Sequence, residues 1–243
     1  MEERNWQQEF EGRVAWIRGL VESSGVKGII FGNSGGKDSA LVGILCKAAC
    51  DNTVGVIMPC ASRRNYGQDA DDGRALAEQF GIETRTVDLT AVRQAELLAL
   101  STATEPSDLA ISNIAPRLRM TTLYTIAQSE GRLVAGTGNR SEAYMGYFTK
   151  WGDGACDFNP ISDLTATEVF AFLRWLEAPS GIIEKAPSAG LFDGQTDEAE
   201  MGVSYRAIDQ YLSEGTGSKA DLDIIGRFHA RSEHKRRPIP TYR

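Results

Sequence analysis

The sequence of 243 residues is poor in the residues that mark several protein classes. It has four cysteines, none in a Cys-x-x-Cys pair, and two histidines, which disfavours a structural zinc site of the usual spacing. No apolar run approaches the roughly 18 residues that span a bilayer. The charged start has no apolar segment typical of a secretory signal. We therefore expect a cytoplasmic protein without a membrane partner.

Basic residues are also few, with 26 Lys and Arg against 33 Asp and Glu, so the formal net charge is −7. An acidic surface disfavours a broad nucleic-acid groove, because the phosphate backbone binds to clustered Lys and Arg. We expect no nucleic-acid partner. The chain has no internal repeat, no low-complexity segment and no long linker, and its length suits one large domain. We expect a single domain over residues 1–243.

Short apolar runs alternate with helical patterns in the first 140 residues. The predicted strands are 26–32, 53–58, 82–88 and 132–136. The predicted helices are 37–50, 69–80, 91–100 and 111–130, with further helices at 165–176, 204–212 and 222–232. Strands that alternate with helices are typical of parallel sheets with helical crossovers. The sequence therefore predicts an α/β fold with a doubly wound, Rossmann-like parallel sheet.

The first predicted strand runs into a small-residue loop at 32–39, which reads Gly-Asn-Ser-Gly-Gly-Lys-Asp-Ser. Glycines let backbone N–H groups approach an anion, and the N-terminus of the following helix adds partial positive charge. A Walker A loop needs four residues between its first Gly and the Gly-Lys pair. Only three separate Gly32 from Gly36, and Asp38 follows Lys37. The loop therefore predicts a phosphate-binding site, but not the Walker A site of kinases and GTPases.

A second polar segment, residues 137–142, follows the last predicted strand and reads Thr-Gly-Asn-Arg-Ser-Glu. Ligands of open parallel sheets bind beyond the carboxyl ends of the strands. Both polar segments lie at such ends, which strengthens the prediction of a binding site there.

The residues Ser34, Gly35, Gly36, Asp38 and Ser39 resemble the Ser-Gly-Gly-x-Asp-Ser signature of the PP-loop ATP pyrophosphatases, which cleave ATP between the α- and β-phosphates. Three later segments, 136–142, 146–154 and 232–236, resemble the NAD synthetases within that superfamily. Glutamine-dependent members carry an additional N-terminal amidase domain. The chain resembles the stand-alone, ammonia-using form.

The resemblance implies a two-step reaction. The carboxylate of deamido-NAD attacks ATP to give an acyl-adenylate and pyrophosphate, and ammonia then displaces AMP to form NAD. It also implies Mg²⁺ as the cofactor, ATP as the co-substrate, and a homodimer with the substrate site at the subunit interface.

The resemblance implies the following site residues. The ATP-binding residues are Gly32, Asn33, Ser34, Gly35, Gly36, Lys37, Asp38, Ser39, Thr137 and Ser188. The metal ligands are Asp38 and Glu142. The dinucleotide-binding residues are Arg117, Lys150, Asp157, His234 and Lys235, most of them in the segment 150–240. Asp153 handles ammonia and, with Lys37, is expected to be catalytic, because a carboxylate attracts ammonium and accepts its proton.

The chain departs from the family pattern at two positions. Lys37 stands where the family has an apolar residue or Gln, and Ala166 stands where the family has an ATP-contacting Lys. We hypothesise that the Lys37 ammonium replaces the lost charge, since a flexible stem lets Lys reach a triphosphate from several sides. In the alternative, Lys37 points to solvent.

Three other functions stay open at this point. The first is the same amidation chemistry on a different carboxylate. The second is a PP-loop enzyme that modifies tRNA, which the acidic composition disfavours. The third is a nucleotide-binding protein without catalysis, which the presence of both Asp38 and Glu142 disfavours.

Overall fold

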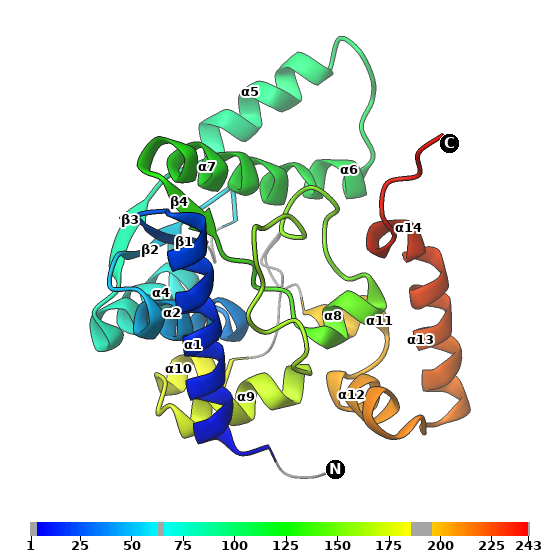
Figure 1. The fold of residues 1–243 in the computed structure, drawn as a ribbon. Helices are drawn as coiled ribbons and strands as arrows, with labels where there is room; N and C mark the ends of the chain where they lie inside the picture. The colour runs from blue at the N-terminus through cyan, green and yellow to red at the C-terminus, as the bar shows by residue number, and fades with distance from the viewer. Residues whose placement is uncertain (1–3, 63–65, 186–195, 243) are drawn as a thin grey trace.

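A computed structural model describes residues 4–62, 66–185 and 196–242 (Figure 1). Its sheet has four strands, β1 (Gly28–Gly32), β2 (Thr53–Ile57), β3 (Glu83–Thr86) and β4 (Arg132–Val134). The strand order is β3-β2-β1-β4, and every neighbouring pair is parallel. The predicted α/β fold with a parallel sheet is confirmed, and the ends of the four predicted strands lie within two residues of the observed ends.

The helices occupy most of the remaining described chain. They are α1 (Trp6–Ser24), α2 (Lys37–Ala49), α4 (Gln68–Phe80), α5 (Thr90–Leu100), α6 (Asp108–Ser112), α7 (Ile114–Glu130), α8 (Arg140–Met145), α9 (Ala166–Trp175), α10 (Ser180–Ile183), α11 (Asp197–Met201), α12 (Tyr205–Glu214), α13 (Lys219–Arg231) and α14 (Glu233–Arg236). The prediction missed α1 and the short helices α8, α10, α11 and α14 and merged α6 with α7. None of the described helices is both long and apolar enough to cross a membrane.

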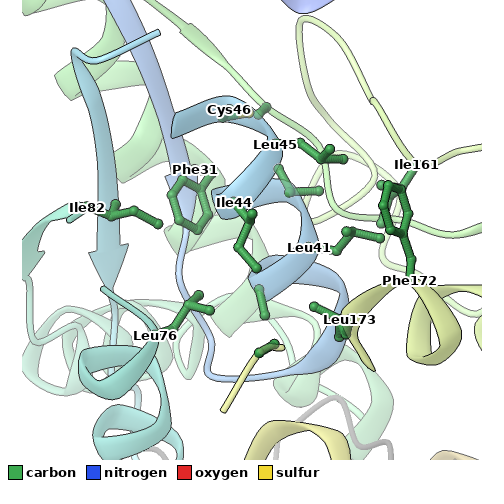
Figure 2. Packing of buried hydrophobic residues seen from close by; sticks show 14 of the residues in the cluster. Phe31, Leu41, Ile44, Leu45, Cys46, Leu76, Ile82, Ile161, Phe172 and Leu173 are labelled. Carbon is green, nitrogen blue, oxygen red and sulfur yellow. The ribbon is translucent and has the colours of Figure 1, made fainter. Parts of the chain in front are cut away.

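The central strands β1 and β2 are buried on both faces because helices cover both sides of the sheet, whereas the residues of the edge strand β3 are exposed or half-buried. Side chains of β1 alternate between the two faces. Ile29 and Phe31 pack with α1, α2, α4 and α9 in one hydrophobic cluster (Figure 2), whereas Ile30 packs with α7 in another. Such near-continuous apolar strands are typical of parallel sheets covered on both sides.

The close packing of α2 on the sheet depends on a glycine. A Cβ atom at Gly43 would lie 2.6 Å from the Cζ atom of Phe31, which is closer than real Cβ contacts. The absence of a side chain therefore lets α2 lie directly on the Phe31 ring. This contact fixes the position of α2, whose first turn carries Lys37 and Asp38.

A third hydrophobic cluster lies among the C-terminal helices. Met145 of α8, Ile208 of α12 and Ile225 of α13 are buried together there with Ala166, the first residue of α9. Figure 1 shows α12 and α13 beside α8, on the side away from the sheet. The cluster holds α8, a helix of six residues that begins just before Glu142, against the rest of the protein.

The connections place one crevice at the centre of the sheet. The chain runs from β1 to β2 and β3 on one side, and then returns to β4 on the other side of β1. Crossovers that leave neighbouring strands in opposite directions open a crevice at the carboxyl ends of those strands. The two polar loops after β1 and β4 therefore flank this switch point.

We expect Phe172→Ala to reduce the free energy of unfolding by about 3–5 kcal/mol, the usual range for a buried Phe. The Phe172 side chain is fully buried, and its ring stacks on Trp6 with 4.9 Å between centroids. Denaturant unfolding measures the change, with the exposed Ile239→Ala as the control. A loss below about 1 kcal/mol would contradict the packing described for α9.

Candidate functional site

A cavity with a volume of about 810 Å³ lies at the switch point. Its walls come from the loops after β1 and β4, from α7, and from the segments around residues 150 and 234. Most of the predicted site residues line it, namely Gly32, Asn33, Ser34, Gly36, Lys37, Asp38, Ser39, Arg117, Thr137, Glu142, Lys150, Asp153, His234 and Lys235. The fold thus brings together residues that are as many as 203 positions apart in the sequence, from Gly32 to Lys235.

The loop at residues 32–39, which we call the phosphate loop, is fixed by contacts with α4. Gly35 has a φ of 68°, and a Cβ atom there would lie 2.1 Å from the carbonyl oxygen of Asp69, so only glycine fits. The buried Asn33 side chain donates a hydrogen bond to Gly73 O at 2.8 Å. Ser34 Oγ and Ser39 Oγ lie 3.0 Å apart. Asn33 and Gly35 therefore fasten the loop to α4, while the two serines lie at the cavity.

Asp38, in the first turn of α2, and Glu142, in the first turn of α8, face one cation. Lys37 Nζ lies 2.5 Å from Asp38 Oδ2 and 4.0 Å from Glu142 Oε1. The alternative in which Lys37 points to solvent is wrong, because its side chain is only 4% exposed. The gap between the two acids therefore has room for a positive charge.

The charge states of this cluster depend on one another. Burial and the neighbouring Asp38 carboxylate raise the pKa of Glu142 well above its usual value, whereas Lys37 partly opposes the shift. Burial lowers the pKa of Lys37, but the attraction of Asp38 and Glu142 outweighs it and the net shift is upward. The site therefore favours an ammonium ion and penalises two uncompensated carboxylates.

Asn139 holds both acids in place, a role that the sequence analysis missed. The side chain of this fully buried residue caps α8 by accepting a hydrogen bond from Glu142 N at 3.0 Å. Its Nδ2 donates to Asp38 Oδ1 at 3.0 Å, and its backbone N donates to Glu142 Oε2 at 3.1 Å. The Asn-x-x-Glu spacing of a capping box was the available signal in the sequence.

Lys185 is a second residue that the sequence analysis missed. Its Nζ lies 2.6 Å from Asp69 Oδ1 and 2.7 Å from Asp72 Oδ2, and it donates to Gly35 O at 3.3 Å. The side chain is 9% exposed and lines the cavity. It therefore ties the phosphate loop to the start of α4. No local pattern marks it, because Gly35 is 150 residues away.

Asp153 faces the cavity from the loop after α8. Its Oδ1 accepts a hydrogen bond from Thr149 N at 3.0 Å, which fixes the loop. Although solvent reaches the residue, the surrounding protein desolvates the carboxylate and raises its pKa, and the bond from Thr149 N opposes that shift. A carboxylate of raised pKa in a cavity is suited to accept a proton.

The segments around residues 150 and 234 meet at the far wall of the cavity. Lys150 Nζ donates to His234 O at 2.8 Å. Lys235 Nζ donates to Gly146 O and Phe148 O at 2.7 and 2.6 Å, and burial lowers its pKa. These cations give the wall a positive charge that suits an anionic ligand.

Arg117 and Arg119 reach the cavity from α7. Arg117 is exposed, as expected of a residue that meets a ligand or a solvated surface. Arg119, which the sequence analysis did not single out, donates its Nε to Met58 O at 3.1 Å, and burial lowers its pKa. Arg119 therefore joins α7 to the end of β2 at the cavity wall.

Among the described residues, two predicted contacts, Gly35 and Asp157, do not line the cavity. The side chain of Asp157 is not part of the cavity wall, because its Oδ2 accepts a hydrogen bond from Val134 N at 2.8 Å and its Oδ1 accepts one from Tyr124 OH at 3.2 Å. It fixes the end of β4, and its contact with the dinucleotide stays a prediction. Ser188 lies outside the residues that the structure describes.

The donors present fit a magnesium ion that shares its coordination with phosphates. In the described part of the chain, no group of three or more His, Cys, Asp or Glu side chains could hold a metal ion alone. Mg²⁺ usually binds one or two carboxylates together with substrate phosphates and water. The pair Asp38 and Glu142, beside a phosphate loop, supplies the protein's part of such a set.

Comparisons with known proteins agree with this geometry. The family described as NAD synthase matches residues 9–239. The chain is 48% identical over 236 residues to the NH(3)-dependent NAD(+) synthetase of Carboxydothermus hydrogenoformans, and the alignment covers 96% of each.

Two solved structures share the fold over nearly the full length. NMN synthetase from Francisella tularensis matches with a TM-score of 0.94 and 37% identity and covers 99% of both chains. NH3-dependent NAD synthetase from Campylobacter jejuni matches with a TM-score of 0.80 and 27% identity, over 99% of this chain and all of that one. The family expected from the sequence motifs is therefore confirmed, and this chain belongs to the NAD synthase family.

Proposed function

We propose that this protein is a ligase that amidates deamido-NAD to NAD with ammonia and ATP. One observation carries the proposal: a single cavity is lined by the loop at residues 32–39, by a pair of acids around a cation, by the Asp153 carboxylate and by a cationic wall. The 48% identity to an NH(3)-dependent NAD(+) synthetase over 96% of the chain supports it.

In the first step, a carboxylate oxygen of the substrate attacks the α-phosphorus of ATP, and the bond to the β-phosphate breaks. Pyrophosphate leaves with concentrated negative charge, so donors must already point at it. We assign this work to the backbone of residues 32–36, to the hydroxyls of Ser34, Ser39 and Thr137, and to the N-terminus of α2. Ser188, outside the described residues, stays a proposed ATP contact.

Mg²⁺ would be held by Asp38 and Glu142, and when bound it supplies charge that stabilises the departing pyrophosphate. The protein's own contribution is to hold both carboxylates in place through Asn139. The Lys37 ammonium lies beside both acids and lines the cavity, within reach of a bound triphosphate.

The substrate has two kinds of anionic group, a carboxylate and a diphosphate. We assign their recognition to Arg117, Lys150, His234 and Lys235, which line the cavity. Arg and Lys form charge-assisted hydrogen bonds with such groups. Lys150 and Lys235 are already held by backbone carbonyls, which limits the entropy lost when a ligand binds.

In the second step, ammonia attacks the acyl carbon and AMP leaves. Ammonium must first lose a proton, and Asp153 is placed in the cavity to attract the cation and accept that proton. Its raised pKa makes it a stronger base than an ordinary aspartate. The same shift means that Asp153 becomes protonated, and stops accepting protons, at a higher pH than an ordinary aspartate as the pH falls.

A second candidate substrate is nicotinate mononucleotide. The match to NMN synthetase has a TM-score of 0.94, against 0.80 for the NAD synthetase of Campylobacter jejuni. The same adenylation and amidation on nicotinate mononucleotide would give NMN. This candidate is one form of the alternative that a different carboxylate is the substrate.

We also propose a homodimer whose interface includes α5 and α6. Neither helix has a buried residue. Figure 1 shows both beyond α7, at the outer edge of the protein, and Leu98 and Leu109 are 75% and 73% exposed. Leu109 also lines the cavity, so a partner on this surface would stand at the entrance of the site.

The first test measures both amidation reactions. We expect kcat/KM with ATP, Mg²⁺ and ammonium to be higher for deamido-NAD than for nicotinate mononucleotide, with NAD and NMN quantified by mass spectrometry. A preference for the mononucleotide would favour the second candidate. Absence of both products, with or without pyrophosphate release, would refute both.

Asp153→Asn tests the second step. We expect the variant to release pyrophosphate from ATP and deamido-NAD but to form at least about 100-fold less NAD, the lower range for loss of a general base. Asp51→Asn, at a fully exposed side chain, is the control. Normal amidation by Asp153→Asn would remove this residue from ammonia handling.

The double variant Val92→Asp/Leu98→Asp tests the dimer. Both positions are exposed on α5, and a charge in a buried interface is unfavourable. We expect the wild type to sediment as two chains and the variant as one, with Ile239→Asp as the control. A wild type that sediments as one chain would refute the proposed dimer.

A further inference from the structure

Lys37 is enclosed in a way that a mobile surface lysine is not. Its ammonium lies 2.5 Å from Asp38 Oδ2 and 4.0 Å from Glu142 Oε1. The rings of Phe170 and Tyr205 cover it, with their centroids 5.7 and 5.4 Å from Nζ. Aromatic faces attract cations, so all four neighbours stabilise a positive charge at this point.

The remaining oxygens of both acids are already engaged. Asp38 Oδ1 accepts a hydrogen bond from Asn139 Nδ2, and Glu142 Oε2 accepts one from Asn139 N. The oxygens nearest to the ammonium are therefore the ones that Asn139 leaves open. A divalent cation that uses both acids has to take the place of the ammonium or lie directly beside it.

We infer that the Lys37 ammonium is a built-in counter-cation. Without ligands, it occupies the position between Asp38 and Glu142 where a divalent cation would bind. When the metal binds together with the nucleotide, the ammonium leaves this position. The inference rests on the proposed metal site of Asp38 and Glu142. The Lys37 ammonium competes with the metal for the two acids, so the protein binds the metal weakly when no nucleotide is present.

The triphosphate supplies the reason for the exchange. Without nucleotide, a divalent ion would bring two positive charges next to the ammonium, and like charges repel each other. With ATP in the cavity, the phosphates offer the ammonium a new partner, because Lys37 lines the same cavity as Ser34 and Ser39. A flexible four-carbon stem permits that movement.

The location also explains the missing lysine at position 166. Phe170, which the ammonium contacts, lies one helical turn after Ala166 on α9. The Lys37 ammonium therefore lies against the helix that carries a lysine in the family pattern. The Lys37 ammonium therefore pairs with Asp38 and Glu142 when no metal is bound, and with the nucleotide after the metal has replaced it.

The test is a titration of the full-length protein with Mn²⁺ alone, followed by electron paramagnetic resonance. We expect Lys37→Met to bind Mn²⁺ at least 10-fold more tightly than the wild type, because the competing ammonium is gone. Lys47→Met, which removes a lysine at the other end of α2, should match the wild type. ATP should narrow the difference between Lys37→Met and the wild type.

Equal Mn²⁺ affinity of the wild type and Lys37→Met would overturn the inference. The double variant Lys37→Met/Asp38→Asn separates that failure from failure of the metal site. If Asp38→Asn does not weaken Mn²⁺ binding in either background, then the proposed metal site itself is wrong.

Thermal unfolding gives a second measurement that does not depend on activity. Without metal, Lys37→Met should melt below the wild type because two partly buried carboxylates lose their cation. Mg²⁺ should raise the melting temperature of Lys37→Met more than that of the wild type. Should Lys37→Met fail to fold, Lys37→Gln removes the charge and keeps a donor for Asp38. The absence of a larger Mg²⁺ effect in the neutral variant would contradict the inference.

Discussion

The structure depends on one electrostatic constraint, the need of two partly buried carboxylates for a shared cation. Asp38 and Glu142 lie in the first turns of α2 and α8, more than 100 residues apart in the sequence, and meet where like charges repel. Loss of one partner from a buried charge pair typically costs about 3–5 kcal/mol. A positive charge beside the two acids offsets their repulsion, which otherwise favours protonation of Glu142. The Lys37 ammonium supplies that charge in the protein alone.

The fold is arranged so that the two acids meet. Adjacent parallel strands β1 and β4 bring their following loops to one edge, and the crossover from β3 opens the crevice between them. Asn139 caps α8 and also donates to Asp38, so the start of one helix sets the geometry of both acids. The C-terminal helices bury the other side of α8. The packing of the C-terminal helices on α8 thus helps to determine where the charges lie.

Much of this arrangement is predictable from the sequence. The strands and long helices follow from apolar periodicity, and the two polar loops at strand ends identify the site. The helix α1 was missed although Asn5 caps its start and Gly25, with φ of 66°, ends it, both ordinary signals. Lys185 and the place of Asp157 were not predictable, because they depend on contacts between distant segments. The cytoplasmic location stays a prediction.

The most direct measurement of the central claim is a crystal structure with Mn²⁺ and an ATP analogue whose α,β-bridging oxygen is replaced by a methylene group. Anomalous scattering from manganese locates the ion independently of the protein atoms. We expect manganese between Asp38 and Glu142, with the Lys37 ammonium moved to a phosphate oxygen. A Lys37 ammonium that still lies between the two acids, with manganese bound elsewhere, would contradict the proposed exchange of the ammonium for the metal.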